Sequence, residues 1–123
     1  MIYTSNFASL RSIRKHAPEL RPVSIARHPP YWYKGLESLE LAPTEAMLAE
    51  GYTPEQYAAM LDEYDPAQVL ENLGEGAVLL CFEARARVAD SDDACHRRMF
   101  AAWIKRRLGI IIPEWMPPVT AKP

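Results

Sequence analysis

The chain has 123 residues, of which 49% are hydrophobic, and a formal net charge of -2. This length is typical of one domain with its own core, held together without metal or disulfide. With 14 basic and 16 acidic residues, bulk electrostatic binding to nucleic acid is excluded, so a basic patch must be local. No apolar run approaches the roughly 18 residues of a membrane span, and the first residues lack the pattern of a secretory signal. We therefore expect a cytoplasmic protein, not bound to a membrane, with reduced cysteines.

The hydrophobic pattern predicts an alternation of strands and helices. In chain order these are a strand at 1–5, a helix at 7–16, a strand at 21–26, helices within 42–74, a strand at 77–83, a helix at 95–108 and a strand at 110–115. The run 77–83 is almost wholly apolar, which is typical of a central parallel strand. The order predicts a three-layer α/β domain over residues 1–115, with a mostly parallel sheet of about four strands, helices on both faces and a mobile tail at 116–123.

Capping residues mark where the predicted helices begin and end. Helix starts are indicated by Asn6 or Ser5, Thr44, Thr53, Asp65 and the residues around Cys95, and helix ends by Gly51, Gly74 and Gly109. Thr53 also has Gln56 three residues later, the spacing of a capping box.

The last helix opens with the unusual stretch Cys95-His96-Arg97-Arg98. At 100° per residue, His96 lies in the middle of the apolar face, and Cys95 and Arg97 flank it. The same geometry directs Arg98 to solvent. His96 and its two neighbours should therefore lie over the end of the sheet.

The strand at 77–83 ends in Cys81 and Glu83, which share one face because strand side chains alternate. In open α/β sheets ligands commonly bind in the crevice outside the carboxyl ends of the strands. We therefore expect a polar crevice where Cys81 and Glu83 meet the helix that begins at Cys95.

The ends of the first two strands and the aromatic loop after the second should contribute to the same crevice. Trp32 or Tyr33 could stack on a base, and Lys34 and Arg27 could meet a phosphate. The candidate ligand-binding residues are Arg97, Ser5, Arg27, Trp32, Tyr33, Lys34 and Cys81.

Catalytic and structural roles both remain open for the polar residues. A thiol at a helix amino end near His and Arg has a lowered pKa, so Cys95 could be a nucleophile, with His96 or Glu83 as acid–base group. Alternatively, Cys95 packs under the crossover and Arg97 pairs with Glu83 to hold it in place. The spacing of Cys81, Glu83, Cys95 and His96 fits no common zinc motif, so no metal and no cofactor is predicted. A Cys81–Cys95 disulfide is not expected in a reducing cytoplasm.

Several segments together resemble a known family. "IYTSNF", "VSIARHPPYWYKGLESLELAP", "LLCFEARARVADSDDACHRRMFAAWI" and "GIIIPEW" are similar to the short form of domain of unknown function 488, often found in phages and mobile elements. The most specific part is an apolar strand ending Cys-x-Glu, then a loop and Cys-His-Arg. The resemblance implies an α/β fold with this signature at one end of the sheet, and it implies no established reaction.

These observations favour a protein that binds or processes a nucleotide, nucleoside or nucleic-acid end in the crevice. The alternative is a non-catalytic protein-interaction module, such as a phage-encoded binder of a host factor, in which the signature is structural. Substrate, reaction and oligomeric state do not follow from the sequence.

Overall fold

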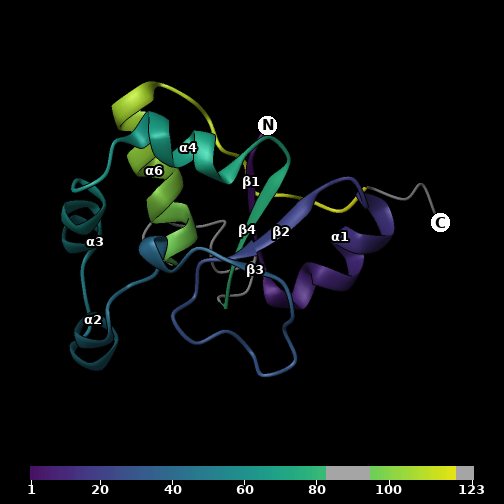
Figure 1. The fold of residues 1–123 in the computed structure, drawn as a ribbon, viewed down its shortest axis with the longest axis horizontal. Coiled ribbons are helices and arrows are strands. Elements are labelled where there is room, and N and C mark those ends of the chain that lie inside the picture. The colour runs from purple at the N-terminus through teal and green to yellow at the C-terminus, as the bar shows by residue number, and fades with distance from the viewer. Residues whose placement is uncertain (83–94, 119–123) are drawn as a thin grey trace.

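The computed structural model describes residues 1–82 and 95–118 of the chain. A four-stranded parallel sheet in the order β1-β4-β2-β3 lies between two layers of helices (Figure 1). This confirms the predicted three-layer α/β fold. The strands are β1 (Tyr3–Asn6), β2 (Arg21–Ser24), β3 (Leu36–Glu37) and β4 (Ala77–Cys81). The helices are η1 (Phe7–Ser9), α1 (Leu10–His16), η2 (Leu39–Leu41), α2 (Glu45–Glu50), α3 (Pro54–Leu61), α4 (Pro66–Leu73) and α6 (His96–Leu108).

Strand β4 is the centre of the sheet, as its unbroken apolar sequence predicts. Each of its five residues is buried, and it pairs with both β1 and β2. The register sets Cys81 beside Asn6 and Leu80 beside Ser24. The carboxyl ends of these three strands therefore meet at one end of the sheet, which we call the carboxyl end.

Alternation along β4 divides the core between the two faces of the sheet. Leu79 and Cys81 pack on the side of α3, α4 and α6, and Val78 and Leu80 pack on the side of α1. Figure 1 shows α3, α4 and α6 together on one side of the sheet and α1 on the other. Helices therefore cover both faces of β4. Because none of its side chains meets solvent, all five can be apolar.

The helix starts and ends predicted from capping residues are confirmed within the described ranges, although Cys95, the N-cap residue of α6, makes no side-chain capping bond. Thr53 and Gln56 form a reciprocal capping box, and the side chains of Thr44 and Asp65 accept backbone N–H bonds at the starts of α2 and α4. Asn6 accepts from the Ser9 amide. Gly109 ends α6 at a positive φ of 71°, which glycine adopts without the steric cost of a Cβ.

The sheet differs from the prediction at its two outer positions. The strand predicted at 110–115 is only a single parallel bridge between Thr4 and Glu114. Pro113 has no N–H, so it contributes only its carbonyl, which accepts from Thr4 N at 3.0 Å. The unpredicted strand β3 is two exposed residues long, too short for its alternation to be read from the sequence.

Some predictions concern residues outside the described ranges. Glu83 and the rest of the crossover to α6 lie there, as do the last five residues of the proposed tail, 119–123. Within the described ranges, no helix combines the length and apolarity needed to cross a membrane.

Candidate functional site

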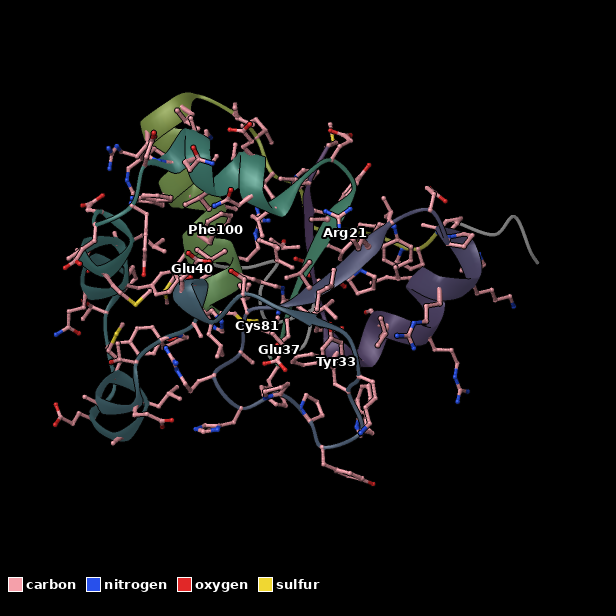
Figure 2. The ribbon with its side chains drawn as sticks, in the orientation of Figure 1. Arg21, Tyr33, Glu37, Glu40, Cys81 and Phe100 are labelled. Atoms are coloured by element: carbon pink, nitrogen blue, oxygen red, sulfur yellow. A yellow bond between two sulfur atoms is a disulfide. The ribbon has the colours of Figure 1, made fainter. Side chains whose placement is uncertain are left out.

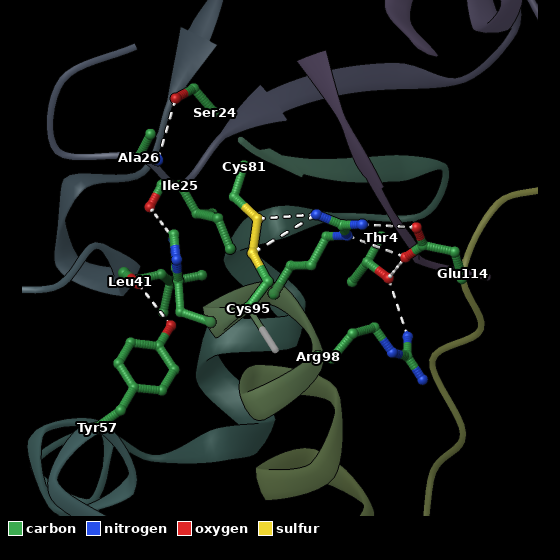
Figure 3. The surroundings of a disulfide bond; sticks show 12 residues. Thr4, Ser24, Ile25, Ala26, Leu41, Tyr57, Cys81, Cys95, Arg98 and Glu114 are labelled. Atoms are coloured by element: carbon green, nitrogen blue, oxygen red, sulfur yellow. Dashed lines mark hydrogen bonds and ion pairs between the residues drawn. A yellow bond between two sulfur atoms is a disulfide. The ribbon is translucent and has the colours of Figure 1, made fainter. Parts of the chain in front are cut away.

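A disulfide joins Cys81, the last residue of β4, to Cys95, the N-cap residue of α6 (Figure 3). The expectation that these cysteines stay unlinked is therefore wrong for this structure. The physical reason is the crossover: β4 ends beneath the point where α6 begins, and both side chains point into the same space. The sequence predicted that Cys81 would lie near the start of this helix, and only the expected reducing compartment argued against the bond.

Arg97 lies beside the disulfide and is completely buried. Its Nε and Nη2 donate to the two carboxylate oxygens of Glu114 at 3.0 and 2.9 Å, a bidentate pair. Its Nη1 donates to the sulfurs of Cys81 and Cys95 at 3.0 and 3.5 Å. A carboxylate partner for Arg97 was predicted, but the partner seen is Glu114, while the predicted Glu83 lies outside the described residues.

His96 is the third inward-facing residue of the signature, 8% exposed, as the helical geometry predicts. Its Nε2 lies 2.7 Å from the carbonyl oxygen of Ile25. A carbonyl only accepts, so Nε2 carries the proton in the neutral ring. Burial lowers the pKa of His96 to about 4; the Ile25 hydrogen bond opposes this shift and the charge of Arg97 adds to it.

Arg98 is not directed to solvent, contrary to the prediction. Its Nη1 donates to Thr4 Oγ1 and to the carbonyl of Ile112, both at 2.9 Å. Thr4 Oγ1 in turn donates to Glu114 at 2.7 Å. The C-terminal segment beside β1 draws Arg98 inward because it brings acceptors that the helical geometry of α6 alone does not include.

We call Cys81, Cys95, His96, Arg97 and Glu114 the polar cluster. The nitrogen or sulfur ligand atoms of its first three members lie within 4.8 Å of one another. Cysteine binds metal ions as a thiolate, and here both sulfurs are bonded to each other. In the disulfide form this set therefore lacks the ligands of a zinc site.

A second group of residues, the aromatic cluster, lies at the same end of the sheet and consists of Phe7, Trp32, Tyr33 and Phe82. Phe7 is buried, and its ring centroid lies 6.3 Å from Trp32, 5.4 Å from Tyr33 and 5.0 Å from Phe82. Trp32 and Phe82 are 47% and 56% exposed. Figure 2 shows Tyr33 and Cys81 at this same end. The sequence indicated the aromatic loop, but Phe82 was missed because it looks like the continuation of a buried strand.

The remaining predicted site residues occupy different environments. Arg27 donates to the carbonyls of Pro43, Leu39 and Ala42 and so holds the backbone before α2. Tyr33 is buried and donates to the carbonyl of Leu36 at 2.7 Å. Lys34 is exposed, two residues after Trp32 in the chain.

Ser5 belongs to the other face of the sheet from the polar cluster. It pairs with Leu80, whose side chain packs on the side of α1. Its Oγ is buried and has no hydrogen-bond partner among the described residues. The sequence therefore assigned Ser5 to the correct end of the sheet, but not to the face that holds Cys81.

A cavity of about 240 Å³ lies between β2, β3 and α4. Arg21, Glu37 and Glu40, labelled in Figure 2, provide its charged lining. The guanidinium of Arg21 is already used by the carbonyls of Leu73 and Glu75. The cavity was not predicted, because β3 was not.

No family model, curated protein or solved structure matches the chain. The resemblance to domain of unknown function 488 accordingly stays a prediction, and the functional argument depends on the geometry of the two clusters.

Proposed function

We propose that the protein binds a nucleotide, nucleoside or nucleic-acid end at the carboxyl end of its sheet, with the aromatic cluster as the stacking surface. One observation supports this above the others: Trp32 and Phe82, from separate segments, both pack on Phe7 and yet leave about half of their surface exposed. Rings held in place but open to solvent suit base stacking, which contributes about 1–3 kcal/mol per base.

The phosphate of such a ligand would meet Lys34 rather than Arg97. Lys34 is exposed and only two residues from Trp32. The Arg97 guanidinium is instead occupied by Glu114 and two sulfurs. The ligand class expected from the sequence is unchanged. Its phosphate is now assigned to the exposed Lys34 and not to the buried Arg97.

Tryptophan fluorescence tests this proposal directly. Trp103 and Trp115 are 1% and 7% exposed, so quenching by an added ligand reports mainly on Trp32. We expect nucleoside monophosphates or short single-stranded oligonucleotides to quench the emission saturably, and the corresponding nucleosides to bind more weakly. Absence of saturable quenching across all four bases, in DNA and RNA, would reject it.

The site can be located by comparing matched variants. Their binding is measured by the anisotropy of a fluorescently labelled oligonucleotide. Phe82→Ala removes an exposed ring of the aromatic cluster and should weaken binding. Tyr64→Ala removes a ring of 36% exposure from the turn between α3 and α4 and should leave binding unchanged. Lys34→Ala should weaken binding of nucleotides and leave nucleosides unaffected.

A catalytic role for Cys95 with His96 or Glu83 remains part of this proposal only for the reduced protein. A sulfur in a disulfide is not a nucleophile, and the His96 Nε2 proton is donated to Ile25. We also propose a cytoplasmic location, which rests on the sequence pattern alone.

The alternative, a protein-interaction module, is favoured by a different surface. Ile110 and Ile111 are 46% and 58% exposed beside Met1, where they line a groove of about 530 Å³ with α4. Photo-crosslinking from position 111 of the full chain in cells would test it, with exposed Lys15 of α1, on the other side of the sheet, as the matched position. A discrete protein adduct from position 111 and none from position 15 is expected on this alternative.

A further inference from the structure

We propose that Cys81 and Cys95 form a thiol–disulfide exchange site, which passes between disulfide and dithiol with a low-molecular-weight thiol/disulfide couple as its partner. The supporting observation is that a completely buried guanidinium, that of Arg97, contacts both sulfurs. This inference is independent of nucleotide binding, because it concerns the buried polar cluster and not the exposed rings.

The contact with Arg97 favours the reduced form over the oxidised one. A disulfide sulfur is neutral and accepts hydrogen bonds weakly, whereas a thiolate carries a full negative charge. Glu114 binds Nε and Nη2 and leaves Nη1 directed at Cys81 and Cys95. A charged donor in this position stabilises a thiolate, so it makes the pair easier to reduce than a disulfide packed only against apolar side chains.

The position of Cys95 makes it the attacking thiol. It is the N-cap residue of α6, a helix of 13 residues whose amino end carries partial positive charge and favours a thiolate. Cys81, whose sulfur is nearer to Arg97, is then the resolving thiol.

The exchange balances in two steps. The Cys95 thiolate attacks one sulfur of a small disulfide, forms a mixed disulfide and releases one small thiolate. The Cys81 thiolate, stabilised by Arg97, then attacks the Cys95 sulfur, forms the Cys81–Cys95 bond and releases the second small thiolate. The protein loses two electrons and two protons, and the small disulfide gains them as two thiols.

Redox equilibration of the full chain tests the pair. The protein is incubated without oxygen, with a chelator, in glutathione buffers of increasing oxidised fraction, then acid-quenched, alkylated and weighed by mass spectrometry. Because the chain has only two cysteines, the alkylated count reports this pair alone. We expect a single transition in which both thiols disappear together. A disulfide that persists in a large excess of reduced glutathione, or a dithiol that persists in a large excess of the oxidised form, would overturn the proposal.

Single variants test the order of the two steps. Cys81→Ser retains the attacking thiol and should form the mixed disulfide with oxidised glutathione about tenfold faster than Cys95→Ser. Equal rates, or a faster Cys95→Ser, would contradict the assignment. If either variant fails to fold, rapid acid quenching of the wild-type protein and peptide mapping replace it, with the glutathione adduct expected on Cys95 and not on Cys81.

Discussion

The two clusters lie at the same end of one sheet and differ in almost every physical respect. The polar cluster lies between the sheet and α6, with Arg97 and Cys81 fully buried and with hydrogen bonds that join β4, α6 and the C-terminal segment. The aromatic cluster extends over the other side, where Phe7 is buried but Trp32 and Phe82 are half exposed. In the disulfide form the polar cluster is satisfied by its own contacts, whereas two rings of the aromatic cluster are open to solvent.

The comparison shows that the residues most conspicuous in the sequence are those already engaged in internal contacts. The stretch Cys95-His96-Arg97 looks like a reaction centre because it combines three reactive residue types. In the folded chain each of them is occupied by a neighbour: a sulfur, a carbonyl and a carboxylate. Residue type thus identified an important region, and only geometry distinguished internal contacts from open ones.

The largest expected effect is that of Arg97→Ala on stability. The substitution leaves the Glu114 carboxylate, 15% exposed, without its bidentate partner, and we expect a loss of about 3–5 kcal/mol in the free energy of unfolding. Urea denaturation measures it, with Arg106→Ala on the exposed face of α6 as control, expected within about 0.5 kcal/mol of wild type. A loss below about 1 kcal/mol would mean that the polar cluster is not closed as described.

Acid should destabilise the polar cluster through His96. The folded pKa of about 4 lies below the ordinary value of 6.5, so the unfolded chain binds the proton more readily. Above pH 6.5 the neutral His96 does not reduce the free energy of unfolding. As the pH falls from 6.5 toward 4, that free energy should decrease by about 3 kcal/mol.

The measurement is the free energy of unfolding of wild type and His96→Gln at several pH values between 4 and 7. Glutamine does not titrate and can still donate to the Ile25 carbonyl. The difference between the two proteins should narrow or reverse as pH falls, because only the wild type carries the histidine penalty. A constant difference would show that His96 keeps an ordinary pKa.

Reduction of the disulfide should lower stability by a similar or smaller amount. Opening a loop of about 15 residues removes a constraint on the unfolded chain worth about 3 kcal/mol, and the bond to Arg97 recovers part of it in the dithiol. Urea denaturation with and without reductant measures this loss. The double variant Cys81→Ser, Cys95→Ser should not respond to reductant.

The smallest stability effect should come from the aromatic cluster. Trp32→Ala removes a half-exposed ring in edge contact with Phe7, and we expect a loss of about 1 kcal/mol or less in the free energy of unfolding. Anisotropy of the labelled oligonucleotide should nevertheless show binding weakened by about 5- to 150-fold, which corresponds to the loss of one stacked base. A decrease of several kcal/mol in the free energy of unfolding would instead identify Trp32 as a core residue. The two clusters would then not differ in the way described.

Local chemistry explains which parts of the fold could be predicted. The capping box at Thr53 and the glycine at 109 depend on backbone groups a few residues away, so the sequence alone locates them. The inward direction of His96 and Arg97 follows from helix periodicity and is likewise confirmed.

Contacts between distant segments could not be predicted in the same way. Glu83 was the expected partner of Arg97 because it ends the preceding strand, whereas Glu114 reaches Arg97 through a single bridge beside β1. The Cys81–Cys95 bond was not expected because a reducing cytoplasm was assumed. The chain nevertheless brings the end of β4 and the start of α6 close together.

The bridge between Thr4 and Glu114 couples the two faces of the sheet. Glu114 turns toward Arg97, and its neighbour Trp115 packs against the opposite core with Leu80, so one short segment completes both sides of the sheet. Because the same segment supplies Glu114 to one face and Trp115 to the other, its displacement from β1 should loosen both helical layers together rather than one layer alone.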